Sequence, residues 1–361
     1  MARFLSFHVS QRSRVSTRRQ ESGQVLIMFV LLIPVLLGMT ALAIDVGTYA
    51  SHRRALQNSA DAMALAAAQE LPDQADAEAA ALSWGAKYGL SADDLDITTT
   101  AASASNPNPS VKVVITRPHA FQFIKALGVG DADVGATATA IKTSPGGVGN
   151  VVPWAVLDAT RLASQPGDTV VLKYDSNNPD QGNFGAIRLD GNGSSVYRDS
   201  IEQGSSSLIC AEGISSCVDT SPVCEGAVCQ SETGNMVGST KSGVDYRISN
   251  TDAHCDTMAE VFTGPTDGQY SLNPACNPWV DGSYTSLRVI VLPVIQSLCN
   301  GSCDVTVTGF SLFWLDGYQY GSCTGSSCEI EGRFISADVT LGALVGKYDP
   351  AAGLHYALLV E

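Results

Sequence analysis

The clearest pattern in the chain is a run of apolar residues near its start. Residues 25–44 carry no charge over twenty positions. Twenty helical residues rise about 30 Å, which is the thickness of the hydrocarbon core of a bilayer. Pro34 and Gly38 lie within the run, and transmembrane helices tolerate both residue types. The pattern therefore predicts one helix that spans a lipid bilayer.

Charge is distributed unevenly around this run. Residues 1–22 form a basic head with five arginines and one glutamate, whereas the whole chain has a net charge of −15. Because positive charge is retained on the cytoplasmic side, we expect a cytoplasmic N-terminus and an extracytoplasmic C-terminal part. The acidic balance disfavours a nucleic-acid partner. A secretory signal cleaved after Ala43 is the alternative, since Ala41-Leu42-Ala43 fits a small-x-small site, and both interpretations export the rest of the chain.

The helix is expected to continue beyond the bilayer as a stalk, so that residues 23–70 form one segment. Residues 49–70 contain no glycine or proline and are rich in alanine, which has the highest helix propensity. Gln57 and Asp61 lie one turn apart and form a polar pair, and Pro72 is expected to end the element. Small residues recur on one side of the helix at three- and four-residue spacing: Ala60, Ala64, Ala67 and Ala68. Two interpretations stay open, a solvated stalk or close contact with another membrane-anchored helix or a second copy.

The rest of the chain predicts an α+β protein. Residues 71–143 read as a small α+β unit, with β-branched strands and two short helices. Residues 144–150 are rich in Gly and predict a linker. Residues 151–361 have short β runs with frequent turns, which favour a β sandwich or a related fold. We therefore expect a transmembrane helix with its stalk, a small α+β unit and a larger, disulfide-rich, mainly-β ectodomain.

Two details of the ectodomain can be predicted from its strongest β run. Residues 304–315 are apolar at consecutive positions towards their end, which indicates a central strand with both faces buried. Asp316-Gly317 follows this run, and an Asp-Gly pair suits a two-residue hairpin turn.

All ten cysteines lie in the second half of the chain, and their number is even. In an exported region this composition predicts disulfides, whereas C-x2-C pairs for zinc are absent from the sequence. Sequence neighbours could pair and close small loops, but the connectivity stays open. The candidates are Cys210, Cys217, Cys224, Cys229, Cys255, Cys276, Cys299, Cys303, Cys323 and Cys328.

Candidate chemistry in the ectodomain is weak, and we assign no catalytic, cofactor-binding or metal-binding residue. Asp190, Asn192 and Ser194 resemble the start of a calcium loop, but its later glycine and acid are missing, so a turn is preferred. Asp281-Gly282-Ser283-Tyr284-Thr285 departs from a D-x-S-x-S metal site at its last position. Aromatic residues could form a platform for sugars, although core packing is the preferred interpretation; they are Trp279, Tyr284, Phe313, Trp314, Tyr318 and Tyr320.

An ordered set of short motifs follows the basic head: Gly23, Pro34, Ile44-Asp45-Val46-Gly47-x-Tyr49, Leu56-Gln57, Ala60-Asp61 and Ala64. Over about residues 20–70 this set resembles the N-terminal segment of TadG-like proteins, the Tad-domain proteins of the Flp/Tad pilus assembly system. The resemblance implies a bacterial envelope protein without enzymatic activity, with other Tad/Flp proteins or itself as partners. Met28 stands where a processed prepilin would carry glutamate, so pilin-type cleavage is not expected.

The leading hypothesis is therefore a membrane-anchored envelope protein with a role in Tad/Flp pilus assembly or surface anchoring. A surface adhesin that recognises glycan or protein through the distal β domain is the alternative. A secreted hydrolase on a β scaffold is a third hypothesis, although the G-x-S-x-G motif is absent from the sequence.

Overall fold

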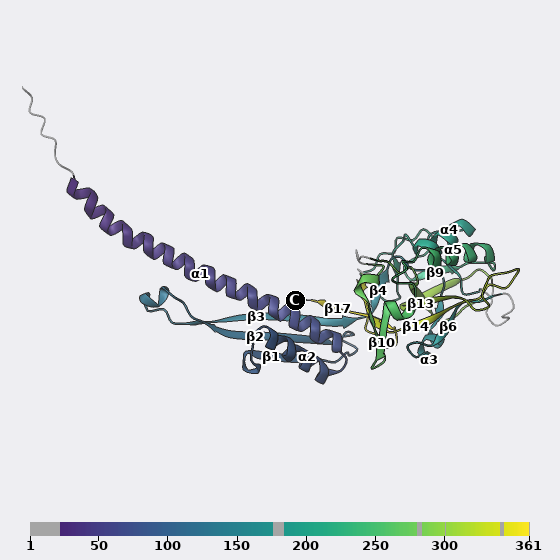
Figure 1. The fold of residues 1–361 in the computed structure, drawn as a ribbon, viewed down its shortest axis with the longest axis horizontal. Helices are drawn as coiled ribbons and strands as arrows, with labels where there is room; N and C mark the ends of the chain where they lie inside the picture. Colours follow the sequence, from purple (N-terminus) through teal and green to yellow (C-terminus); the bar gives the residue numbers. More distant parts are fainter. Residues whose placement is uncertain (1–21, 176–183, 280–283, 300, 340–342, 361) are drawn as a thin grey trace, which may run out of the picture. The chain divides into compact units, whose positions relative to one another are not determined.

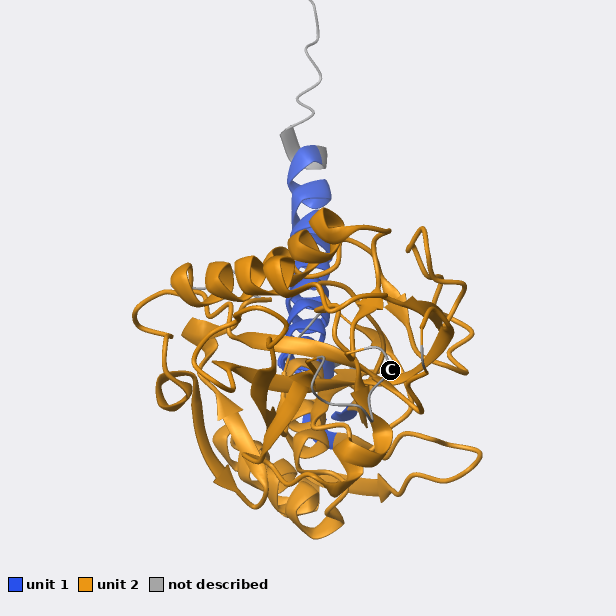
Figure 2. Cartoon of the chain, turned by 90° about the vertical axis from the view of Figure 1, so that its right-hand side faces the viewer, with its two compact units in different colours: residues 1–55, 116–135 blue, residues 56–115, 136–361 orange. Residues whose placement is uncertain are grey.

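The computed structural model describes residues 22–175, 184–279, 284–299, 301–339 and 343–360. The chain divides into two compact units (Figure 2). The first unit holds the chain up to residue 55 together with residues 116–135, and the second holds residues 56–115 and 136–361. The basic head expected at 1–22 lies, apart from Ser22, outside the described residues.

A single helix, α1, runs from Ser22–Glu70 (Figure 1). Its apolar part is long enough to cross a membrane, and the large apolar side chains of residues 25–44 are between 45% and 68% exposed. A helix long and apolar enough to span a membrane is therefore present, as predicted, and α1 ends two residues before Pro72 as expected.

The first unit also contains the loop between two paired strands, β2 (Ser110–His119) and β3 (Ala132–Thr143). A short 3-10 helix, η2 (Ile124–Leu127), forms within this loop. It ends at Gly128, which has a φ of 83° that suits glycine. We call residues 121–129 the hairpin tip.

One of the two seven-stranded sheets of the described chain includes β2 and β3, together with strands from much later in the sequence. Its strands, in spatial order, are β1 (Leu95–Thr100), β2, β3, β17 (Leu354–Leu359), β15 (Ala337–Asp338), β11 (Gln269–Leu272) and β10 (Phe262–Thr266). β17 pairs antiparallel with β3, with Leu358 opposite Ile141. The expected strands of residues 71–143 are thus present, but the C-terminal strand completes their sheet and covers the edge that β3 would otherwise expose.

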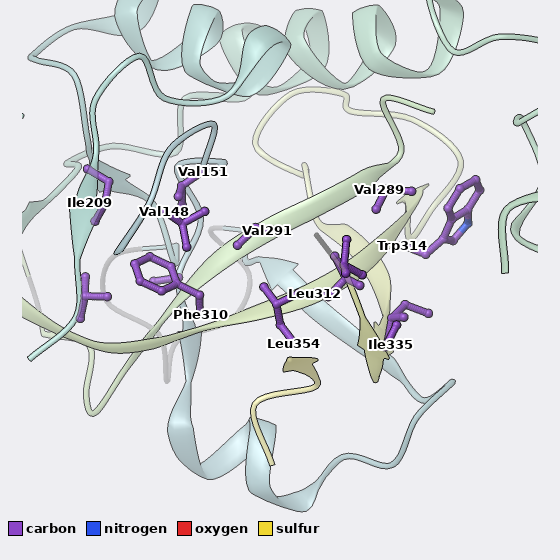
Figure 3. Close-up of a cluster of buried hydrophobic side chains, with 14 of the residues drawn as sticks. Val148, Val151, Ile209, Val289, Val291, Phe310, Leu312, Trp314, Ile335 and Leu354 are labelled. Carbon is purple, nitrogen blue, oxygen red and sulfur yellow. The ribbon is translucent and has the colours of Figure 1, made fainter. Parts of the chain in front are cut away.

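A second sheet has both faces buried. Its main path is β5 (Val156–Leu157), β12 (Val289–Ile295), β13 (Asp304–Tyr318), β14 (Ile330–Ile335) and β6 (Thr169–Lys173), joined by β9 (Val228–Ser231) and β7 (Ile187–Arg188). Along β12, Val289 and Val291 pack into one apolar cluster, whereas Ile290 and Leu292 pack into another. Figure 3 shows the first cluster. The central position predicted for β13 is confirmed, since it pairs with β12, β14 and β9.

Two local predictions in this region differ from the structure. Asp316-Gly317 is not a hairpin turn, because β13 continues to Tyr318 and takes up the extra residue as a bulge opposite β14. Residues 144–150, expected to be a linker, contain the buried strand β4 (Pro145–Val148). β4 lies between β16 (Leu344–Val345) and β8 (Ile209–Cys210) in a third sheet. The backbone of β16 approaches Gly146 so closely that a Cβ there would lie 2.7 Å from the Val345 carbonyl oxygen, which explains the glycine.

The ectodomain is mainly β, as expected, but it also contains helices that its short β runs did not predict. In α4 (Ser194–Gln203) the buried residues Tyr197 and Ile201 lie one turn apart. The helix packs on α5 (Val237–Ser249), where a Cβ at Gly243 would lie 2.6 Å from the Ile201 side chain. The other helices of the second unit are α2 (Gln74–Lys87), α3 (Asp158–Ala163), α6 (Met258–Val261), η1 (Ala92–Asp94) and η3 (Pro274–Cys276).

The predicted disulfides are confirmed, and each joins two cysteines that are neighbours along the sequence. The longest loop lies between Cys255 and Cys276, which are 21 residues apart, and the other four pairs are separated by four to seven residues. The four other pairs are Cys210–Cys217, Cys224–Cys229, Cys299–Cys303 and Cys323–Cys328. The bridges therefore brace local loops rather than joining distant strands.

Candidate functional site

The motif residues that follow the apolar run lie on one face of α1. Asp45, Tyr49 and His52 are spaced by four and three residues, so helical geometry places them on the same side. In the first unit this side meets the hairpin tip and the end of β2. We call these contacts the tip clamp.

The carboxylate of Asp45 is the polar centre of the tip clamp. It accepts hydrogen bonds from three successive backbone N–H groups, at 2.9 Å from Gln122, 2.9 Å from Phe123 and 2.6 Å from Ile124. These groups precede or begin η2 and have no partner within that helix. The Asp45 side chain is buried. A buried carboxylate needs such donors, because a charge removed from water without partners is strongly unfavourable.

Aromatic rings continue the tip clamp along α1. The Tyr49 ring stacks on Phe121 with centroids 6.0 Å apart, and it meets the edge of His119 at 5.6 Å. One turn further, the Nδ1 atoms of His52 and His119 lie 3.2 Å apart and share a hydrogen bond. The strand end and the hairpin tip are therefore attached to α1 by one charged and several aromatic contacts.

The second half of the motif lies in the second unit and serves a different contact. Gln57 Nε2 donates to Asp61 Oδ1 at 2.8 Å, which is the polar pair expected from the sequence, and to the Thr137 carbonyl of β3 at 2.9 Å. Further along, the buried Lys142 side chain of β3 donates to the Gln69 carbonyl at 2.7 Å. Polar bonds thus fix this part of α1 along β3.

The alanine strip lies against the chain's own sheet. Its four alanines are fully buried, as are the inward residues Val111, Val113 and Ile115 of β2. Neither sequence interpretation of the strip is correct, because the chain itself buries the four alanines and leaves them accessible neither to solvent nor to a helix of another protein. Small side chains are needed here because they let α1 approach a strand closely. Leu56, one turn before Ala60 on α1, is buried as well. The buried residues of this side of α1 therefore include Leu56, Ala60, Ala64, Ala67 and Ala68.

Three other motif residues have no such contact. Pro34 lies within the exposed apolar part of α1, and a Cβ at Gly47 would meet nothing within 4 Å. Gly23 lies in the first turn of α1. Nothing within the described chain explains these three positions.

The weak chemical candidates of the ectodomain have structural roles. Burial alone would raise the pKa of Asp190, but hydrogen bonds donated by Ser200, Ser206 and Ser207 outweigh it and hold this pKa below its ordinary value. The Asp190 carboxylate therefore organises a turn, as preferred from the sequence. Phe313 lies in the core, so it does not belong to an aromatic platform. Among the described residues no group of three or more His, Cys, Asp or Glu side chains could hold a metal; positions 281–283 lie outside them.

One buried lysine has a perturbed proton affinity. Lys173 on β6 is fully buried, and its Nζ donates to Asn235 Oδ1 at 2.6 Å and to the Cys328 carbonyl at 3.0 Å. Burial lowers the pKa of Lys173 to about 8, although the negative charges of Asp175 and Glu329 act in the opposite direction.

A comparison with known protein families gives a match to the N-terminal segment, which contains the α1 residues of the tip clamp. Residues 23–70 match the Tad family model, described as "Putative Flp pilus-assembly TadE/G-like". This segment is a Tad domain. The resemblance inferred from the sequence is thereby confirmed, and the match ends where α1 ends. Neither the curated proteins nor the solved structures give a match.

The partners of the Tad motif residues could not be found by spacing alone. Asp45 bonds to backbone groups 77 to 79 residues away, and backbone groups carry no sequence signal. One signal was available, since a carboxylate directly after a membrane span requires hydrogen-bond donors. The sequence did not indicate which loop supplies them.

Proposed function

We propose that this protein is a non-enzymatic envelope protein that takes part in Tad/Flp pilus assembly or surface anchoring. The Tad domain carries this proposal, because its match begins at the apolar part of α1 and includes the α1 residues of the tip clamp. In the proposal, α1 holds the protein in the bilayer with residues 1–22 in the cytoplasm. The disulfide-braced ectodomain then lies on the extracytoplasmic side, where disulfides persist.

Within this role, the tip clamp keeps the hairpin tip attached to α1 at the extracytoplasmic end of its apolar part. A short, well-satisfied contact of this kind transmits force from the end of the span into strands β2 and β3. Assembly machinery that contacts the tip would then act on the anchor rather than on a free loop.

Deletion and complementation in the native bacterium test the proposal. We expect deletion to abolish surface pili and the wild-type gene to restore them. Asp45→Ala should restore fewer pili at an equal membrane level of the protein, because three N–H groups lose their acceptor. Val46→Ala is the matched control, since Val46 is exposed on α1 and makes no clamp contact.

Unchanged piliation after deletion would overturn the assembly role. Normal pili combined with the loss of glycan or host binding would instead favour the adhesin hypothesis. Protease digestion of a C-terminal tag in spheroplasts tests the orientation, which would be wrong if only permeabilised cells lost the tag. An N-terminus at Ile44 would show cleavage instead of a retained anchor.

A further inference from the structure

The first unit contains an apolar groove beside the membrane-spanning part of α1. It has a volume of about 640 Å³ and is lined by apolar side chains from two segments. α1 contributes residues between Leu37 and Ile44, and the hairpin tip contributes Phe123, Ile124 and Ala126.

The residues of α1 that line this groove show how deep in the bilayer it would lie. Leu37 lies seven residues before Ile44, the end of the charge-free run, and seven helical residues rise about 10 Å. An element that contacts α1 between these residues therefore lies below the edge of the hydrocarbon core. Interfacial segments reach a similar depth of about 5–10 Å.

The hairpin tip has the surface expected at that depth. Phe123 is 48% exposed and Val129 is 44% exposed, although both are large and apolar. Along residues 121–131 the charged side chains are Lys125 and Asp131, and they form an ion pair at 2.6 Å. A lysine stem can lie along apolar surface while its ammonium group reaches the headgroups.

The tip clamp satisfies the main requirement for loop backbone in lipid. Polar backbone groups in the hydrocarbon region must be hydrogen-bonded within the protein. The Asp45 carboxylate meets this requirement for the N–H groups of Gln122, Phe123 and Ile124. An exposed loop in water would need no such acceptor, because water would bond to these groups.

We propose that the hairpin tip enters the bilayer beside α1 as a second membrane contact, with lipid acyl chains in the groove. We assign lipid as the occupant because one wall of the groove is continuous with the exposed apolar surface of α1, which itself faces lipid if α1 spans the bilayer. The proposal needs α1 to span the bilayer, but it does not depend on a role in pilus assembly.

Quenching by brominated lipid tests this contact in the full chain. Phe123→Trp and Val129→Trp are reconstituted separately into phosphatidylcholine vesicles with bromine near the headgroup end or the tail end of the acyl chains. Tyr320→Trp is the control, since Tyr320 is an exposed aromatic residue of the ectodomain. The emission of the wild-type chain, which has four tryptophans, is subtracted from each spectrum.

We expect the emission of both tip variants to shift to shorter wavelength and to be lost mainly with bromine near the headgroup end. The control should keep its emission in every lipid. Absence of quenching in both tip variants would overturn the proposal. A wavelength shift without quenching would also overturn it, because protein rather than lipid would then cover the tip. Either failure would leave the pilus assays unaffected.

Discussion

Removal of the Tyr49 ring should release the hairpin tip without unfolding the rest of the protein. Tyr49→Ala deletes two ring contacts, the stack on Phe121 at 6.0 Å and the edge contact with His119 at 5.6 Å. Each aromatic pair contributes about 0.5–1.5 kcal/mol beyond its buried area. The free energy of opening the tip should therefore fall by about 1–3 kcal/mol, which corresponds to a factor of about 5 to 150 in the opening equilibrium.

Amide hydrogen exchange of the reconstituted protein measures this equilibrium directly. The N–H groups of Gln122, Phe123 and Ile124 are bonded to Asp45, so they exchange only when the tip opens. In Tyr49→Ala a peptide that covers them should exchange faster by the factor given above. Peptides from β12 and β13 should be unchanged, because they belong to the other unit.

Two matched variants make the result specific. Tyr49→Phe retains the ring and should exchange like the wild type. Val46→Ala, on an exposed part of α1, should also have no effect. The reasoning is refuted if Tyr49→Ala leaves exchange of the tip unchanged, or if Val46→Ala accelerates it equally.

Three further results are expected in the second unit. Ala64→Leu should lower the free energy of urea unfolding by about 1–3 kcal/mol, because the site on α1 is fully buried. Asn58→Leu, on the exposed side of α1, should change this free energy little. Equal losses in the two variants would contradict the packing. Lys173 has a pKa of about 8 against an ordinary 10.5, so the unfolded chain binds more protons between these values and stability should rise with pH across this window. The free energy of unfolding from urea titrations should rise by roughly 3 kcal/mol across this window, and Lys173→Met should lack the rise. Parallel pH dependences of the two proteins would refute the assignment. Replacing Cys255 and Cys276 by alanine should lower the free energy of unfolding by about 3 kcal/mol through loop entropy, against about 2 kcal/mol for any of the shorter loops. Thermal unfolding measures both losses. The reverse ranking would count against the entropic explanation.

Predictions from local pattern succeeded where a property depends on nearby residues alone. The spanning part of α1 follows from its apolar length, and β1 and β2 follow from their β-branched content. Asp316-Gly317 shows the limit of this reasoning. Its turn chemistry is local, but β14 pairs with β13 on both sides of the Asp-Gly pair, and this non-local pairing continues the strand through it as a bulge.

The candidate site was predictable in its residues but not in its contacts. The Tad motif singled out Asp45, Tyr49 and Gln57, and all three make contacts that attach α1 to the rest of their unit. The roles of His119 and Phe121 were not predicted, because nothing in the sequence around them indicates a contact with α1. The alanine strip was interpreted as a surface because helical spacing shows which residues share a face, but not what covers that face.

The sequence by itself determined a helix long and apolar enough to span a membrane, the continuation of that helix, the disulfide content and the family of the N-terminal segment. These properties follow from apolar length, propensity, composition and motif order, which are fixed along the chain. Only the tertiary structure decided that β17 closes the sheet beside β3, that the alanines are internal, and that Asp45 holds the hairpin tip. Each of these joins groups distant in sequence, and such contacts form only when the whole chain selects one arrangement that satisfies its buried polar groups and packs its apolar ones.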